Sequence, residues 1–151
     1  MVCKYLITNL KLCQGTLDYR HWQIPLSRGF RSLKLWFVLR LYGQEGLRSH
    51  IRKHIGLAQE FEALMEADDR FEITAPVTMG LVCFRLRGSN HINESLNMAI
   101  NDEGRIHITP SKIGDVYFLR FAVCSRFTES ADISFAYEII TKHAEQIIKV
   151  K

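Results

Sequence analysis

The sequence predicts an α+β domain in which helices pack on one face of a mostly antiparallel sheet. Two observations lead to this class. In three segments the apolar residues recur every three or four positions, as in helices with one buried side. In short runs between them, apolar and polar residues alternate, as in half-buried strands. The resulting order of elements favours antiparallel pairing of the strands. It is helix, helix, strand, strand, helix, strand, strand, helix.

The first expected helix, residues 30–41, differs from the others because it is apolar on nearly all sides. A helix of this kind is normally covered all round, and a chain of 151 residues has little else to cover it. We therefore expect a partner or further chain at this helix. Tyr42-Gly43 and Gly46 interrupt the pattern, and a one-sided helix follows at 47–65.

Short strands and two more helices make up the rest. Gly104 is expected to end a helix that begins near Asn90, because glycine favours the left-handed conformation found after a helix. Thr128 or Ser130 is expected to cap the last helix. The other expected elements are strands at 71–75, 81–87, 106–108 and 117–123, with a loop at 109–115.

Length and composition fit one globular domain, with 47% apolar and 24% charged residues. No apolar run is long enough to span a membrane, and residues 1–17 lack the pattern of a signal peptide. The four cysteines contain no C-x-x-C pair. They favour a reduced, cytoplasmic protein over a secreted one with two disulfide bridges.

Positive charge is concentrated between Arg20 and Lys53, where Glu45 is the only acidic residue. Such a block suits nucleic acid, an anionic cofactor or an acidic surface in a larger assembly. Acidic residues follow at once between Glu60 and Asp69, so the charge reverses along one expected helix. In a nucleic-acid-binding surface, the positive charge would more naturally continue along the helix. Nucleic-acid binding is therefore the least favoured of the functions that we consider.

The segment 18–37 is the candidate site, because it combines aromatic residues, cations and a helix start. Pro25 biases Ile24 toward an extended backbone, and Ser27 offers a hydroxyl that can cap the helix after it. The segment is therefore expected to be a loop that delivers polar side chains to a fixed helix entrance. Loops held by rigid elements are common sites of binding and catalysis.

Two other patterns are weaker. His50 and His54 have the H-x-x-x-H spacing of metal sites, but Ile51 replaces the glutamate of zinc proteases and two cations follow it. A solvated basic face is favoured, and no metal site is expected. Lys112 lies in an expected polar loop near Asp115, which gives it neither the burial nor the cationic neighbour of a reactive lysine.

Four motifs resemble the aromatic-L-amino-acid decarboxylases, the pyridoxal-phosphate-dependent group that includes histidine decarboxylase. They are Asp18–Leu26 (DYRHWQIPL), Phe30–Phe37 (FRSLKLWF), Gly80–Asn90 (GLVCFRLRGSN) and Phe118–Arg126 (FLRFAVCSR). The resemblance is to the C-terminal part only. It divides the chain into a lead-in at 1–17, an active-site loop with a long linking helix at 18–42, and the small C-terminal domain of a fold-type-I enzyme at 43–151.

The resemblance implies a homodimer that removes the carboxylate of an aromatic amino acid as CO₂, with the pyridine ring of the cofactor as electron sink. It implies that Leu26 and Ser27 reach the cofactor phosphate of the neighbouring subunit. Arg20, Arg28 and Arg126 match arginines that support this loop and the site entrance.

Departures from the family pattern limit what this chain is expected to do alone. The lysine that binds the cofactor covalently is absent, so no decarboxylation is expected without another chain. Tyr5-Leu6 matches a catalytic tyrosine that returns a proton after CO₂ leaves. Ser27 resembles histidine decarboxylases or aldehyde-forming relatives, which leaves those activities open. A non-catalytic dimerisation or regulatory module that pairs with full-length subunits is a further alternative.

Overall fold

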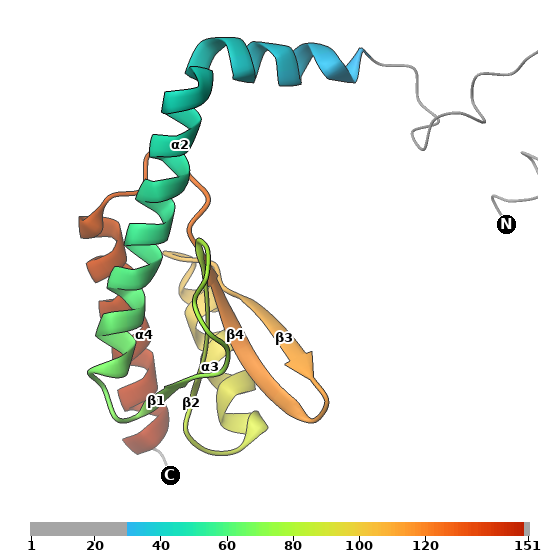
Figure 1. The fold of residues 1–151 in the computed structure, drawn as a ribbon. Helices are drawn as coiled ribbons and strands as arrows, with labels where there is room; N and C mark the ends of the chain where they lie inside the picture. Colours follow the sequence, from blue (N-terminus) through green and yellow to red (C-terminus); the bar gives the residue numbers. More distant parts are fainter. Residues whose placement is uncertain (1–29, 150–151) are drawn as a thin grey trace, which may run out of the picture. The chain divides into compact units, whose positions relative to one another are not determined.

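The computed structural model describes residues 30–149, and the chain divides into two compact units between Leu41 and Tyr42. The elements, labelled as in Figure 1, are α2 (Arg31–Glu66), β1 (Phe71–Ile73), β2 (Leu81–Leu86), α3 (Asn90–Glu103), β3 (Thr109–Ile113), β4 (Val116–Ala122) and α4 (Ser130–Lys149). The four strands form one antiparallel sheet in the order β1-β2-β4-β3. The predicted α+β class is confirmed.

Helix α2 is interrupted at Gly43, whose backbone angles (φ 62°, ψ −177°) are not helical. Side chains other than hydrogen rarely tolerate this region, so glycine is what permits the interruption. The predicted break is thus confirmed at Gly43, whereas Gly46 stays helical. After the break, Ala58, Phe61 and Met65 are buried on one side of α2, which confirms the predicted one-sided helix for this part of the segment. Leu57 is buried with them, whereas Ile51, earlier in the predicted apolar stripe, is 49% exposed.

The prediction for residues 106–115 was wrong. The expected strand at 106–108 is not one, and the expected loop contains strand β3. Ile108 instead bonds through both backbone groups to the side chain of Asn101. Pro110 pairs with Leu119 in a strand at the sheet edge, where a residue without an N–H is tolerated. Pro110 and Gly114, which led to the prediction of a loop, therefore lie within and directly after the edge strand β3.

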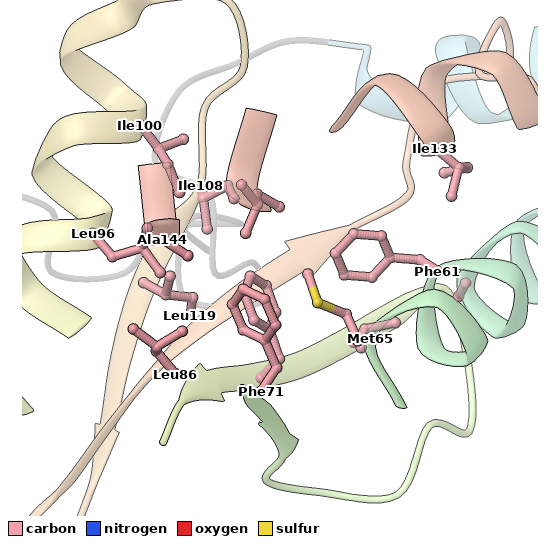
Figure 2. Packing of buried hydrophobic residues seen from close by; sticks show 14 of the residues in the cluster. Phe61, Met65, Phe71, Leu86, Leu96, Ile100, Ile108, Leu119, Ile133 and Ala144 are labelled. Atoms are coloured by element: carbon pink, nitrogen blue, oxygen red, sulfur yellow. The ribbon is translucent and has the colours of Figure 1, made fainter. Parts of the chain in front are cut away.

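The pairing register separates the two faces of the sheet. Val82, Phe84 and Leu86 lie on one face, and the partners of the first two, Phe121 and Leu119, lie on it with them. This face belongs to the core, together with buried residues of α2, α3 and α4. Figure 2 shows side chains from helices and strands pointing into this interior, among them Phe61, Met65, Leu96, Ile100, Ile133 and Ala144. The helices therefore cover one face, as predicted.

Polar contacts connect the last two helices. Gly104 follows α3 in the left-handed conformation (φ 73°), which confirms it as the predicted end of that helix. Glu103, beside it, accepts a hydrogen bond from Lys142 Nζ (3.0 Å) and contacts His143 Nε2 (2.6 Å) on α4. The imidazole of His143 and the ammonium of Lys142 lower the pKa of Glu103, because both stabilise its carboxylate.

Candidate functional site

One residue of the predicted site lies in the described part of the chain. Arg126 is found in the connection between β4 and α4, whereas five others lie outside residues 30–149: Tyr5, Arg20, Leu26, Ser27 and Arg28. The surroundings of Arg126 therefore represent what the structure shows of the candidate site.

Arg126 is exposed, yet three neighbours hold it. Its Nη1 donates a hydrogen bond to the hydroxyl oxygen of Tyr42 (3.1 Å). Its guanidinium lies over the ring of Phe127, 4.5 Å from the centroid, where the π-electrons attract a cation. Its carbonyl oxygen lies 3.5 Å from Nζ of Lys53, which donates to it. The side chain of Arg126 is thus held by Tyr42 of α2 and by Phe127 of the same connection, and its backbone carbonyl is held by Lys53 of α2.

Two more contacts join α2 to this connection. Lys53 Nζ forms an ion pair with Glu129 at 2.5 Å. His54 donates from Nε2 to the carbonyl oxygen of Ser125 at 3.1 Å, which requires the proton on that nitrogen. We call the set Tyr42, Lys53, His54, Ser125, Arg126 and Glu129 the Arg126 clasp. The Arg126 clasp connects residues 42–54 of α2 to the β4–α4 connection.

Gly80 allows this close approach. A β-carbon there would lie 3.0 Å from the carbonyl oxygen of Val123 and 3.5 Å from Cβ of His54. Val123 also donates its backbone N–H to the carbonyl of Gly80 at 2.8 Å. A larger residue would force the β4–α4 connection away from β2. Nothing in the residues next to Gly80 in the sequence marked this packing role.

The two histidines have a different setting from the one predicted. The rings of His50 and His54 lie 4.0 Å apart between centroids, and that of His50 lies 6.2 Å from the ring of Tyr42. Both histidines are partly buried rather than fully solvated. Within residues 30–149, no three histidine, cysteine or acidic side chains come close enough to hold a metal ion.

The described lysines do not fit covalent attachment of pyridoxal phosphate. Such a lysine must lose its charge, usually through burial or a cationic neighbour. Four of the described lysines instead form ion pairs with carboxylates: Lys53 with Glu129, Lys112 with Asp115, Lys142 with Glu103 and Lys149 with Glu145. The fifth, Lys34, lies exposed on α2. This part of the chain therefore supplies no covalent cofactor site.

The sequence matches the model of the pyridoxal-dependent decarboxylase conserved domain over residues 1–87, more than half of the chain. The chain belongs to the pyridoxal-dependent decarboxylase family. Pyridoxal phosphate is the cofactor of this family, and the predicted resemblance is confirmed. No helix among residues 30–149 is both long and apolar enough to cross a membrane.

Curated relatives are aromatic-L-amino-acid decarboxylases. The protein from Manduca sexta is 61% identical over 134 residues, which are 89% of this chain and 26% of that protein. The protein from Rattus norvegicus is 54% identical over 134 residues, 28% of its length. The chain thus spans about a quarter of the length of the curated relatives it matches.

Solved structures agree. Tryptophan decarboxylase from Catharanthus roseus, in complex with L-tryptophan, is 40% identical with a TM-score of 0.77, over 86% of this chain and 29% of that one. The 4-hydroxyphenylacetaldehyde synthase from Rhodiola rosea is 34% identical with a TM-score of 0.77, over 91% of this chain and 31% of that one. The fold described above is therefore a part of the decarboxylase fold.

Proposed function

We propose that this chain is the C-terminal portion of an aromatic-L-amino-acid decarboxylase, comprising the active-site loop and linking helix at 18–42 and the small domain at 43–151. The observation that carries the proposal is the 61% identity to the Manduca sexta decarboxylase across 89% of this chain. The substrates proposed are aromatic amino acids such as DOPA, tryptophan or tyrosine. Pairing with a second decarboxylase chain in the cytoplasm would complete the enzyme.

In this proposal the chain's own residues act at the rim of a site that another chain completes. Leu26 and Ser27 would contact the cofactor phosphate of the neighbouring subunit, with Arg20, Arg28 and Arg126 supporting the loop. Tyr5 would return a proton to the substrate after CO₂ leaves. The ion-paired lysines support the further proposal that this chain does not catalyse decarboxylation alone.

A chimera tests the main proposal. Residues 18–151 replace the matched quarter of the Manduca sexta decarboxylase, and CO₂ release is measured with DOPA, tryptophan, tyrosine and histidine. The proposal expects activity on at least one aromatic amino acid, with the unaltered Manduca enzyme as the control. A chimera that is folded and binds pyridoxal phosphate, yet releases no CO₂ from any of them, would contradict it.

The isolated chain tests the claim that it is inactive alone. It is mixed with pyridoxal phosphate, treated with borohydride, and analysed by mass spectrometry for a modified lysine. We expect no specific modification, because the described lysines other than Lys34 are held in ion pairs. Labelling of one particular lysine, together with CO₂ release, would overturn this claim and leave the family assignment intact.

Histidine decarboxylation or aldehyde formation is the second candidate. Ser27 motivates it, and the structural similarity to the Rhodiola rosea aldehyde synthase supports it. In the chimera, the products are separated and identified as amine or aldehyde. Amine without aldehyde from DOPA, tryptophan or tyrosine, together with no CO₂ release from histidine, would exclude both alternatives for this segment. A change of product when Ser27 is replaced by glycine would support a role of this residue in the choice.

A non-catalytic module that pairs with full-length subunits is the third candidate. Residues 30–41 support it, because eight of their large apolar side chains are 40–79% exposed: Phe30, Leu33, Leu35, Trp36, Phe37, Val38, Leu39 and Leu41. Exposed apolar surface of this extent marks an interaction site. Co-purification with a tagged full-length decarboxylase would support pairing, and a monomer at high concentration that binds no such subunit would contradict it.

A further inference from the structure

A cavity of about 270 Å³ opens where the last turn of α4 meets the turn from β2 into α3. Figure 1 shows both segments at the same end of the domain. Four aliphatic residues and two arginines line the cavity: Leu86, Ile92, Ile147, Ile148, Arg70 and Arg87. All six belong to the second compact unit, and none of them belongs to the candidate site or to the Arg126 clasp.

The aliphatic residues provide an apolar wall that reaches into the core. Leu86 is 2% exposed, whereas Ile148, near the end of α4, is 47% exposed. Gly88 brings the turn after β2 close to Ile92, since a β-carbon at Gly88 would lie 3.1 Å from Cδ1 of that residue. An apolar group in the cavity would leave water for contact with these side chains, which is favourable.

The two arginines lie toward solvent, because the side chain of Arg70 is 33% exposed and that of Arg87 is 62% exposed. The backbone N–H of Arg87 donates to the carbonyl of Arg70 at 2.8 Å, so the two residues lie opposite one another across the continuation of the β1–β2 pair. Like charges in opposite positions repel, and an anion between them relieves the repulsion. Among the described residues, no carboxylate lines the cavity beside these arginines.

Both guanidinium groups retain nitrogen atoms for an anion. Arg70 uses Nε and Nη2 in its hydrogen bonds to Asp68, which leaves Nη1, 3.6 Å from Glu145. Arg87 uses Nε in a bond to a backbone carbonyl, and its Nη1 lies 3.6 Å from Glu72. Both of these 3.6 Å separations exceed an ordinary hydrogen bond. The carboxylate of Glu145 therefore competes for Arg70 without occupying its Nη1.

We propose that this cavity binds a free monocarboxylate with an unbranched apolar tail. The tail would lie against Leu86 and the three isoleucines, and the carboxylate would accept hydrogen bonds from Arg70 and Arg87. Such charge-assisted bonds are stronger than neutral ones, and the planar guanidinium suits a carboxylate. The proposal is independent of the proposed function, because none of these residues is assigned to the decarboxylase site.

The volume of the cavity sets the size of the ligand. A cavity of about 150 Å³ holds benzene, so about 270 Å³ accommodates about ten non-hydrogen atoms. Octanoate has this size and is the probe. For a ligand of about ten atoms, the usual affinity per atom corresponds to a dissociation constant on the order of 1 mM.

Titration of the whole chain with octanoate, followed by NMR of the isoleucine methyl groups, tests the proposal. We expect the methyl resonances of Ile92, Ile147 and Ile148 to shift together and to saturate with a dissociation constant of about 1 mM. Octanol and octylamine carry the same tail without the carboxylate, and they should bind at least about tenfold more weakly. Acetate carries the carboxylate without the tail and should cause no saturable shift.

Substitutions separate the contribution of the arginines from general electrostatics. Arg87→Met removes the charge and keeps an apolar stem at an exposed position, so it should weaken octanoate binding about tenfold. Arg87→Lys should restore part of the affinity. Glu145→Gln removes the carboxylate that competes for Arg70, and it should tighten binding about threefold.

Lys142→Gln is the matched control, because it removes a positive charge from α4 outside the cavity. It should leave the affinity for octanoate unchanged. Thermal denaturation shows that each variant is folded.

Equal affinity for octylamine, or undiminished affinity in Arg87→Met, would overturn the proposal, because the arginines would then not select an anion. Absence of a saturable shift up to about 20 mM octanoate would overturn it as well. The C-terminal carboxylate of a peptide is a second source of the same chemistry. A short peptide ending in leucine that binds more tightly than octanoate would contradict the assignment to a free acid. None of these measurements uses pyridoxal phosphate or enzymatic activity.

Discussion

Asn93 on α3 binds both backbone polar groups of Leu86, the last residue of β2. Its Oδ1 accepts from the N–H of Leu86 at 2.7 Å, and its Nδ2 donates to the carbonyl of Leu86 at 2.9 Å. A second bond from Nδ2 reaches the carbonyl of Ser89 at 3.1 Å. Asn93 is fully buried, so it replaces the strand partner that Leu86 would otherwise need.

Asn93→Ala should therefore be strongly destabilising. It leaves the N–H and C=O of Leu86 without partners in the interior, which costs about 2–4 kcal/mol for the two groups together. Urea denaturation, followed by circular dichroism, measures the change in the free energy of unfolding.

Asn101→Ala is the matched comparison on the same helix. Asn101 makes the same pair of bonds to Ile108, but its side chain is only partly buried, so water can replace some of what is lost. We expect a cost of about half that of Asn93→Ala. Equal costs would show that burial of the bonded groups does not determine the effect.

Two glycines in open surroundings should respond oppositely to alanine. At Gly56, inside α2, and at Gly104, after α3, a β-carbon would meet no atom within 4 Å beyond its local neighbours. Gly104 has φ 73°, where a β-carbon strains the backbone, so Gly104→Ala should destabilise by about 1 kcal/mol. Gly56 is helical, so Gly56→Ala should stabilise by about 0.4–1 kcal/mol.

Thermal denaturation of the two alanine variants beside the unaltered chain checks this pair. Because steric contact is absent at both positions, the difference in sign isolates the backbone conformation. A gain in melting temperature for both variants would mean that the left-handed cap at Gly104 contributes little to the stability of the domain.

Local chemistry made much of the domain predictable. The apolar spacing of α2 after the break, the cap at Gly104 and the alternation in β2 each depend on residues close together in the sequence, and each was confirmed. The edge strand β3 was missed because Pro110 and Gly114 carry the same local signal in a loop and in a hairpin. Residues 109–113 form a strand rather than a loop because they pair with β4, and this pairing leaves no local signal in the sequence.

The candidate site was predictable only in part. Arg126 was identified through its motif, whereas its partners Tyr42 and Lys53 carried no local signal. Lys53 and Glu129 are separated by 76 residues, and Tyr42 and Arg126 by 84. Contacts over such separations arise from the packing of α2 beside the β4–α4 connection, which no periodicity in the sequence reports.

Acid should weaken the domain through Asp68, which follows α2. Hydrogen bonds from the guanidinium of Arg70, at 2.5–3.0 Å, lower the pKa of this carboxyl. Because the pKa is lower in the folded chain than in the unfolded one, the stabilisation is complete above the unfolded value of about 4 and is lost as the pH falls through the folded value. Arg70 also lies 3.6 Å from Glu145 of α4, so the loss affects the attachment of that helix.

Asp68→Asn should therefore lower the melting temperature at pH 7 and flatten its dependence on pH below about pH 4. Asp69→Asn is the control, because the exposed carboxylate of Asp69 forms no ion pair with another residue among 30–149. It should leave both the melting temperature and its acid slope nearly unchanged. If Asp68→Asn keeps the full slope, other carboxylates, with Glu103 beside His143 the first to examine, carry the acid sensitivity.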